Sequence, residues 1–183
     1  KTISSDLNTD IGKLKSIVLA RGDHAATSAD LTNGATTEEQ KTYYDTYIAP
    51  SACMNVQAEF DSLIGNIVQK VNDILNTAGY NDGDFEAGQT TANTETNLLF
   101  TLKATGEGWH ISNINVNSNY LQTPSLLSFK TADGKADYDT TTKLKEAFQE
   151  EAYVLNPDLT QKTSFTEYYQ DLVNQVTNTK AKV

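Results

Sequence analysis

The sequence predicts a mainly α-helical protein, an elongated helical bundle with a small antiparallel β-hairpin inserted in it. Two observations predict this fold. Apolar residues recur at alternating steps of three and four along most of the chain, as on helices that pack along one face. The step changes to two only near residues 98–116, as in short strands. We expect the 183 residues to form one elongated domain, with a loop and hairpin insertion at about 79–136.

The first helix is predicted from about Thr9 to Arg21, because apolar residues that include Leu14 and Val18 repeat there at helical spacing. Gly22 follows at the position where a left-handed residue commonly ends a helix. Residues 23–37 are small and polar, and we expect them to form a loop.

A second helix is predicted to begin at Thr36 or Thr37, because Glu39 and Gln40 stand three residues after them, as a capping box requires. This helix carries a tyrosine cluster. Pro50 disfavours helical geometry at the preceding residue, Ala49, and therefore predicts a break at that point.

The longest helix is predicted over 52–78, which corresponds to about 40 Å at 1.5 Å per residue. A helix of that length favours a rod of packed helices. Its packing stripe has steps of four and three and is centred on Phe60, Ile64, Ile67, Val71 and Ile74. Further apolar residues widen it to the stripe of a core-facing helix: Val56, Leu63, Val68 and Leu75. Cys53 is the only cysteine, and we expect it to be a buried small hydrophobe.

The hairpin is predicted from two strand-like runs, Leu98–Lys103 and Trp109–Val116, joined by a short loop that contains two glycines. The alternation of apolar residues changes parity along the second run, which predicts a bulge near Ser112. The preceding residues, 80–97, are acidic and are expected to form an exposed loop. After the hairpin, we expect a short helix that is capped by Asp137 or by Asp139. The sequence does not decide between these two residues.

The final helix begins at Ser164, which with Glu167 forms another capping box. Its apolar residues have the 3.5-residue period of a coiled-coil seam: Phe165, Tyr169, Leu172 and Val176. The pattern continues to the last residue, and we expect the sequence to be a piece of a longer protein. Together with Leu14, Val18 and the stripe of the longest helix, these residues form what we call the predicted seam.

Charge and motifs argue against several functions. The net charge of −10 repels phosphate backbones and anionic lipid headgroups, so neither nucleic acid nor a membrane is an expected partner. His24 and His110 have no ligands at metal-binding spacing, and no phosphate-binding loop or nucleophile motif is present in the sequence. We therefore expect no catalytic, cofactor or metal site. The tyrosines Tyr43, Tyr44 and Tyr47 could stack on carbohydrate, but are more typical of a helix interface.

Three segments carry a resemblance to a known family: TDIGKLKSIVLARGD at 9–23, NVQAEFDSLIGNIVQKVNDIL at 55–75, and LNPDLTQKTSFTEYYQDLV at 155–173. They resemble the flagellar hook-associated protein 1 family, the hook–filament junction protein, in its clostridial form. The resemblance implies a central segment of an extracellular axial protein of the bacterial flagellum, with an elongated helical domain and no catalytic activity. The partners that it implies are the hook protein, filament-side junction proteins and further copies of the same chain.

Two other function classes stay open. The chain could be a secreted adhesin or glycan-binding surface module that uses the loops 23–37 and 80–97. An enzymatic function has only scattered carboxylates in its favour, and no two of them are singled out as a catalytic pair.

Overall fold

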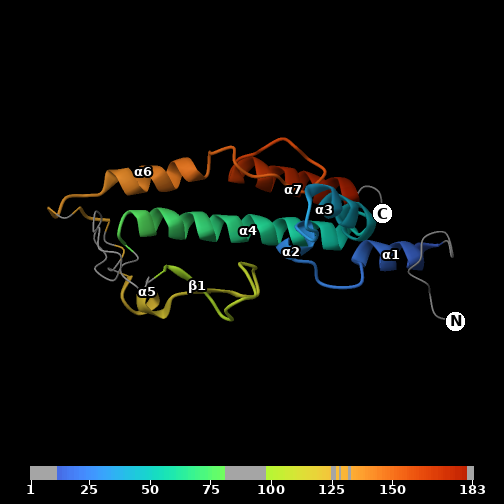
Figure 1. The fold of residues 1–183 in the computed structure, drawn as a ribbon, viewed down its shortest axis with the longest axis horizontal. Coiled ribbons are helices and arrows are strands. Elements are labelled where there is room, and N and C mark those ends of the chain that lie inside the picture. The colour runs from blue at the N-terminus through green and yellow to red at the C-terminus, as the bar shows by residue number, and fades with distance from the viewer. Residues whose placement is uncertain (1–11, 81–97, 125–126, 128, 132, 181–183) are drawn as a thin grey trace. The chain divides into compact units, whose positions relative to one another are not determined.

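The structure, a computed structural model, describes residues 12–80, 98–124, 127, 129–131 and 133–180. It is mainly helical with one two-stranded antiparallel sheet, as the sequence predicts (Figure 1). The residues group into two compact units: the first contains residues up to Leu63 and from Glu151 onwards, and the second contains Ile64–Glu150. The expected single elongated domain stays a prediction, and each unit is described by itself.

The first unit is built from helices that surround the N-terminal half of the longest helix, α4. These helices are α1 (Lys13–Arg21), α2 (Ser28–Leu31), α3 (Thr37–Tyr43), the π-helix η1 (Tyr44–Ile48), α4 (Ala52–Thr77, shared with the second unit) and α7 (Phe165–Lys180). One buried apolar cluster joins α2, η1 and α4, and consists of Ala26, Leu31, Tyr44, Ile48, Met54 and Ala58. The short helix α2 lies within 23–37, which the sequence predicts to be a loop throughout.

The predicted helix starts are confirmed where they depend on local capping. Thr36 Oγ accepts the Glu39 amide at 3.2 Å, and the Glu39 carboxylate accepts the Thr36 amide at 3.0 Å. Ser164 and Glu167 form the same reciprocal pair at the start of α7, at 3.3 and 2.9 Å. α1 begins at Lys13, and the start predicted at Thr9 lies outside the described residues.

The helix break at Pro50 is also present, but the prediction for Ala49 is wrong. Ala49 keeps right-handed helical geometry, with φ −57° and ψ −34°. Its amide donates to the Tyr44 carbonyl at 2.9 Å, five residues back, so the wider π-turn holds Ala49 in the helix. A turn through Ala49 and Pro50 then ends the helix, and α4 begins at Ala52.

The second unit places the hairpin and a helix on opposite sides of the C-terminal half of α4 (Figure 1). Strands β1 (Phe100–Leu102) and β2 (Ile114–Val116) are antiparallel, with Phe100 opposite Val116. α5 (Ser118–Gln122) follows within the predicted insertion, as a short helix that the sequence analysis does not anticipate. α6 (Tyr138–Ala147) is capped by Asp137, whose carboxylate accepts the Thr140 amide at 3.0 Å, so Asp137 and not Asp139 is the cap.

The hairpin loop is wider than predicted. Residues 109–113 form turns instead of the first part of a strand, and no bulge forms near Ser112. Asn113 explains this loop, because its side-chain amide donates to the carbonyls of Ala104 and Gly108, both at 2.9 Å. Its side-chain oxygen accepts the Ala104 amide at 2.8 Å. A buried amide side chain therefore replaces the strand pairing that the alternating pattern suggests. The predicted loop at 80–97 lies outside the described residues except for Tyr80, which is buried.

Candidate packing surface and buried carboxyl site

The seam predicted on α7 divides into a buried part and an exposed part. Phe165 and Leu172 are buried, whereas Tyr169 is 53% exposed and Val176 is 46% exposed. The buried position between Phe165 and Leu172 belongs to Tyr168, not to Tyr169. The helix face that the first unit buries is thus rotated away from the predicted seam.

The apolar residues of α7 extend beyond the face that the unit buries. At 3.6 residues per turn, the inward residues Tyr168 and Leu172 and the outward residues Tyr169, Val173 and Val176 together cover an arc of about 140°. The three outward side chains are spaced by four and three residues, and Val173 is 41% exposed. α7 therefore carries a second apolar strip, Tyr169, Val173 and Val176, which we call the outer strip.

The stripe predicted on α4 is only partly the buried face. The residues Leu63, Val68 and Leu75, which widen the stripe, are buried, but its central residues are not. Phe60 is 38% exposed, and Ile64, Ile67, Val71 and Ile74 are only partly buried. In the second unit the buried positions are Gly65, Val68, Asn72 and Leu75. Their centre lies about 100° around the helix from the central residues of the predicted stripe.

Polar and small residues on the buried face explain this rotation. Asn72 binds the backbone of Phe100 twice: its amide donates to the carbonyl at 2.9 Å, and its oxygen accepts the Phe100 amide at 3.0 Å. These are the groups of β1 that point away from β2, so Asn72 covers the outer edge of the sheet. Gly65 has no side chain, and the Trp109 carbonyl occupies the space where a Cβ would be.

The predicted seam residues on α1 are not brought into a core. Leu14 is 58% exposed and Val18 is partly buried, while the buried residue of this helix is Lys15.

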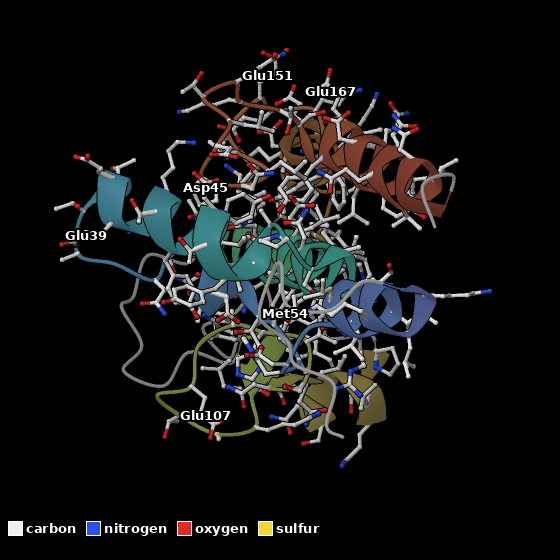
Figure 2. All side chains as sticks on the ribbon, turned by 90° about the vertical axis from the view of Figure 1, so that its right-hand side faces the viewer. Glu39, Asp45, Met54, Glu107, Glu151 and Glu167 are labelled. Carbon is white, nitrogen blue, oxygen red and sulfur yellow. The ribbon has the colours of Figure 1, made fainter. Side chains whose placement is uncertain are left out.

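The prediction for Cys53 is wrong, because this thiol is exposed. Cys53 stands seven residues before Phe60 and therefore on the same, exposed side of α4, whereas its neighbour Met54 points into the core (Figure 2).

The first unit contains a fully buried carboxyl group, Glu59, which sequence reasoning missed. Its side chain is 0% exposed. Oε1 accepts the Asn156 amide at 2.8 Å and the Gln175 amide at 3.4 Å, and Oε2 has no hydrogen-bond partner. The only signal in the sequence is an acidic residue between Ala58 and Phe60, in a segment with an apolar pattern.

The contacts of Glu59 belong to a network that joins four segments of this unit. Asn55 donates to the Gln175 side-chain oxygen at 3.1 Å and accepts the Tyr44 hydroxyl at 2.9 Å. The Tyr168 hydroxyl lies 2.9 Å from the Glu59 carbonyl, which it can donate to. We call Glu59, Asn156, Gln175, Asn55 and Tyr44 the Glu59 network. Burial raises the pKa of the Glu59 carboxyl to about 7, although the amide hydrogen bonds from Asn156 and Gln175 act in the opposite direction.

The other carboxylates of the first unit differ in exposure, and Asp61 is also buried, where it accepts the Ser28 amide at 2.8 Å. Glu39, Glu151 and Glu167 are exposed and point outward (Figure 2). His24 lies between two carboxylates, with Nδ1 2.7 Å from Asp23, and that hydrogen bond raises the pKa of His24. In the part of the chain that the structure describes, no three His, Cys, Asp or Glu residues are placed to hold a metal ion.

The tyrosine cluster is divided between core and surface. Tyr44 is buried, whereas Tyr43 and Tyr47 lie with ring centroids 5.0 Å apart beside an open groove of about 530 Å³ along α3. The hydroxyls of Thr42 and Thr46 in this groove already donate to helix carbonyls, at 2.8 and 2.7 Å.

Comparison of the chain with models of protein families, with curated proteins and with solved structures found no match. Within the described ranges, no helix has both the length and the apolar character to cross a membrane.

Proposed function

We propose that this chain is a structural segment of a bacterial flagellar axial protein of the hook–filament junction type, located outside the cell. It acts by packing against neighbouring subunits and carries out no catalysis. Its partners in this proposal are the hook protein, filament-side junction proteins and further copies of itself. The proposal begins from the resemblance of the segments 9–23, 55–75 and 155–173 to that family.

The observation that carries the proposal is the outer strip of α7. A helix that packs only within its own unit needs an apolar stripe of about 100°, but α7 has an apolar arc about 40° wider. Tyr169, Val173 and Val176 are between 41% and 53% exposed, at the spacing by which a second helix would pack. Exposed apolar strips of this kind are typical of surfaces that contact another protein.

The test is a swimming assay in the bacterium that encodes the chain. Val176→Asp places a charge on the outer strip without disturbing the buried face, and is expected to abolish swimming and filament attachment. Asn174→Asp is the matched control, because Asn174 is exposed on the opposite side of α7. Normal swimming and normal filaments with Val176→Asp would contradict the proposal, provided that circular dichroism shows the same folded helix content for both variants.

A second candidate function is a secreted glycan-binding module, and one observation favours it. The exposed ring of Tyr47 and the partly buried ring of Tyr43 lie beside an open groove with Glu38, and aromatic rings are common platforms for sugars. The engaged threonine hydroxyls leave few free groups to hydrogen-bond a sugar. Glycan-array binding that disappears with Tyr47→Ala, while swimming is unaffected by Val176→Asp, would favour this function over the first.

A further inference from the structure

We propose that protonation of Glu59 controls how firmly α7 packs on the N-terminal half of α4, with α7 held while the carboxyl is neutral and loosened when it ionises. This inference concerns regulation of the first unit and does not depend on the proposed function.

The geometry around Glu59 suits the neutral acid better than the carboxylate. An ionised carboxylate has two oxygens that each accept hydrogen bonds, and burying one requires donors on both. Here both donors, the amides of Asn156 and Gln175, approach Oε1, and Oε2 has none. Ionisation would therefore leave a negative charge out of water with half of its acceptors unpartnered.

The groups that face Glu59 from the neighbouring elements offer no positive charge. η1 contributes the phenol of Tyr44 and α7 contributes that of Tyr168. Burial raises the pKa of both phenols, which stay neutral near pH 7. The segment before α7 contributes the uncharged Asn156, and α4 itself contributes the uncharged Asn55. Among the described residues, no cation forms an ion pair with Glu59.

The groups that donate hydrogen bonds to the Glu59 carboxyl belong to α7 or to the segment before it, so the charge of Glu59 affects how α7 packs. Gln175 stands on α7 and Asn156 stands in the segment that leads to α7. The hydroxyl of Tyr168, also on α7, lies within hydrogen-bond distance of both the Glu59 and the Leu155 carbonyls. Water can reach an ionised Glu59 only if some of these contacts open, so ionisation favours a loosened α7.

The direction of the pH effect follows from proton binding. The packed state has a Glu59 pKa raised to about 7, and in an opened state the carboxyl returns towards its ordinary value of 4.5. The packed state therefore binds more protons between these values, and its stability falls as the pH rises through this window and levels off above it. Between pH 5 and pH 8 the opening equilibrium constant of α7 is expected to rise roughly 50- to 100-fold.

The experiment measures hydrogen exchange of the α7 amides from pH 5 to pH 8 in the whole chain, corrected for the pH dependence of intrinsic exchange. The wild type is expected to lose protection over this range by the stated factor. Glu59→Gln keeps an acceptor for Asn156 and Gln175 but cannot ionise, and its protection is expected to be independent of pH. Glu38→Gln, an exposed glutamate of the same unit, is expected to behave as the wild type.

Equal pH dependence in the wild type and in Glu59→Gln, or a wild type with no pH dependence, would overturn the proposal. If Glu59→Gln does not fold, a carbon-13 NMR titration of the Glu59 carboxyl in the wild type decides the question. A midpoint near pH 7 that coincides with the loss of α7 protection supports the proposal, and a midpoint below pH 5 overturns it.

Discussion

Replacement of Gly65 by alanine is expected to destabilise the second unit, against the usual effect of this substitution in a helix. In an unhindered helix interior, Gly→Ala stabilises by about 1 kcal/mol, because glycine loses more backbone entropy on folding. At Gly65 the new Cβ would overlap the carbonyl oxygen of Trp109 and would lie 3.4 Å from the carbonyl carbon. The obstacle is backbone, which cannot move away as the end of a side chain can.

The size of the effect follows from these two opposing contributions. Overpacking at a rigid contact costs about 1–3 kcal/mol, and this overlap belongs at the upper end of that range. After the gain of about 1 kcal/mol from helix propensity is subtracted, the free energy of unfolding is expected to fall by roughly 2 kcal/mol.

The assay is denaturant unfolding followed by the fluorescence of Trp109, the only tryptophan of the chain, which reports on the contact itself. Asp73→Ala is the matched control, because Asp73 is exposed on the same helix and alanine there gains helix propensity without an obstacle. A Gly65→Ala variant that is more stable than the wild type would refute the close approach of α4 to the Trp109 backbone.

Three further predictions test the buried polar contacts and the exposed thiol. Asn72→Ala removes both hydrogen bonds to Phe100 and is expected to lower the free energy of unfolding of the second unit by about 2–3 kcal/mol, measured by the same fluorescence transition. Ser164→Ala removes the cap of α7 and is expected to cost about 1 kcal/mol, measured by thermal unfolding with circular dichroism. Cys53 is expected to react with a maleimide in the folded protein at a rate within about tenfold of that in denaturant, since its thiol is exposed. Slow labelling of the folded protein would place Cys53 in a core.

Helix ends could be predicted from the sequence because the contacts that set them are local. The pairs at Thr36 with Glu39 and at Ser164 with Glu167 each join residues three apart, and spacing alone identifies them. Gly22 similarly ends α1 with φ +79°. The start of α2 has the same kind of local contact, from the Thr27 amide to the Asp30 carboxylate at 2.8 Å. The surrounding residues are small and polar, and for that reason the sequence analysis predicts a loop there instead of a helix.

The buried face of α4 could be predicted only in part, because distant segments determine its centre. A hydropathy pattern counts Asn72 as polar and Gly65 as neutral, and so centres the core on the isoleucine stripe about 100° away. In the structure Asn72 serves the edge of β1, 28 residues away, and Gly65 admits the Trp109 backbone. In the first unit, Asp61 is likewise a polar side chain of α4 that binds a distant backbone group, because its carboxylate accepts the Ser28 amide at 2.8 Å. A helix face rich in side chains that bind backbone is buried without being apolar.

Tyr168 and Tyr169 are adjacent at the start of α7 but face different surroundings. One contacts the core of its own unit, and the other is exposed where another chain could contact it. The coiled-coil period selects Tyr169, but the core of the first unit selects Tyr168, whose hydroxyl lies within hydrogen-bond distance of the Glu59 carbonyl. Adjacent residues on a helix point about 100° apart, so one tyrosine cannot serve both contacts. Because Tyr168 already meets the needs of the unit, the exposed Tyr169 and the rest of the outer strip, Val173 and Val176, are not required for its fold. This separation is why a charge on the outer strip can test assembly without testing stability.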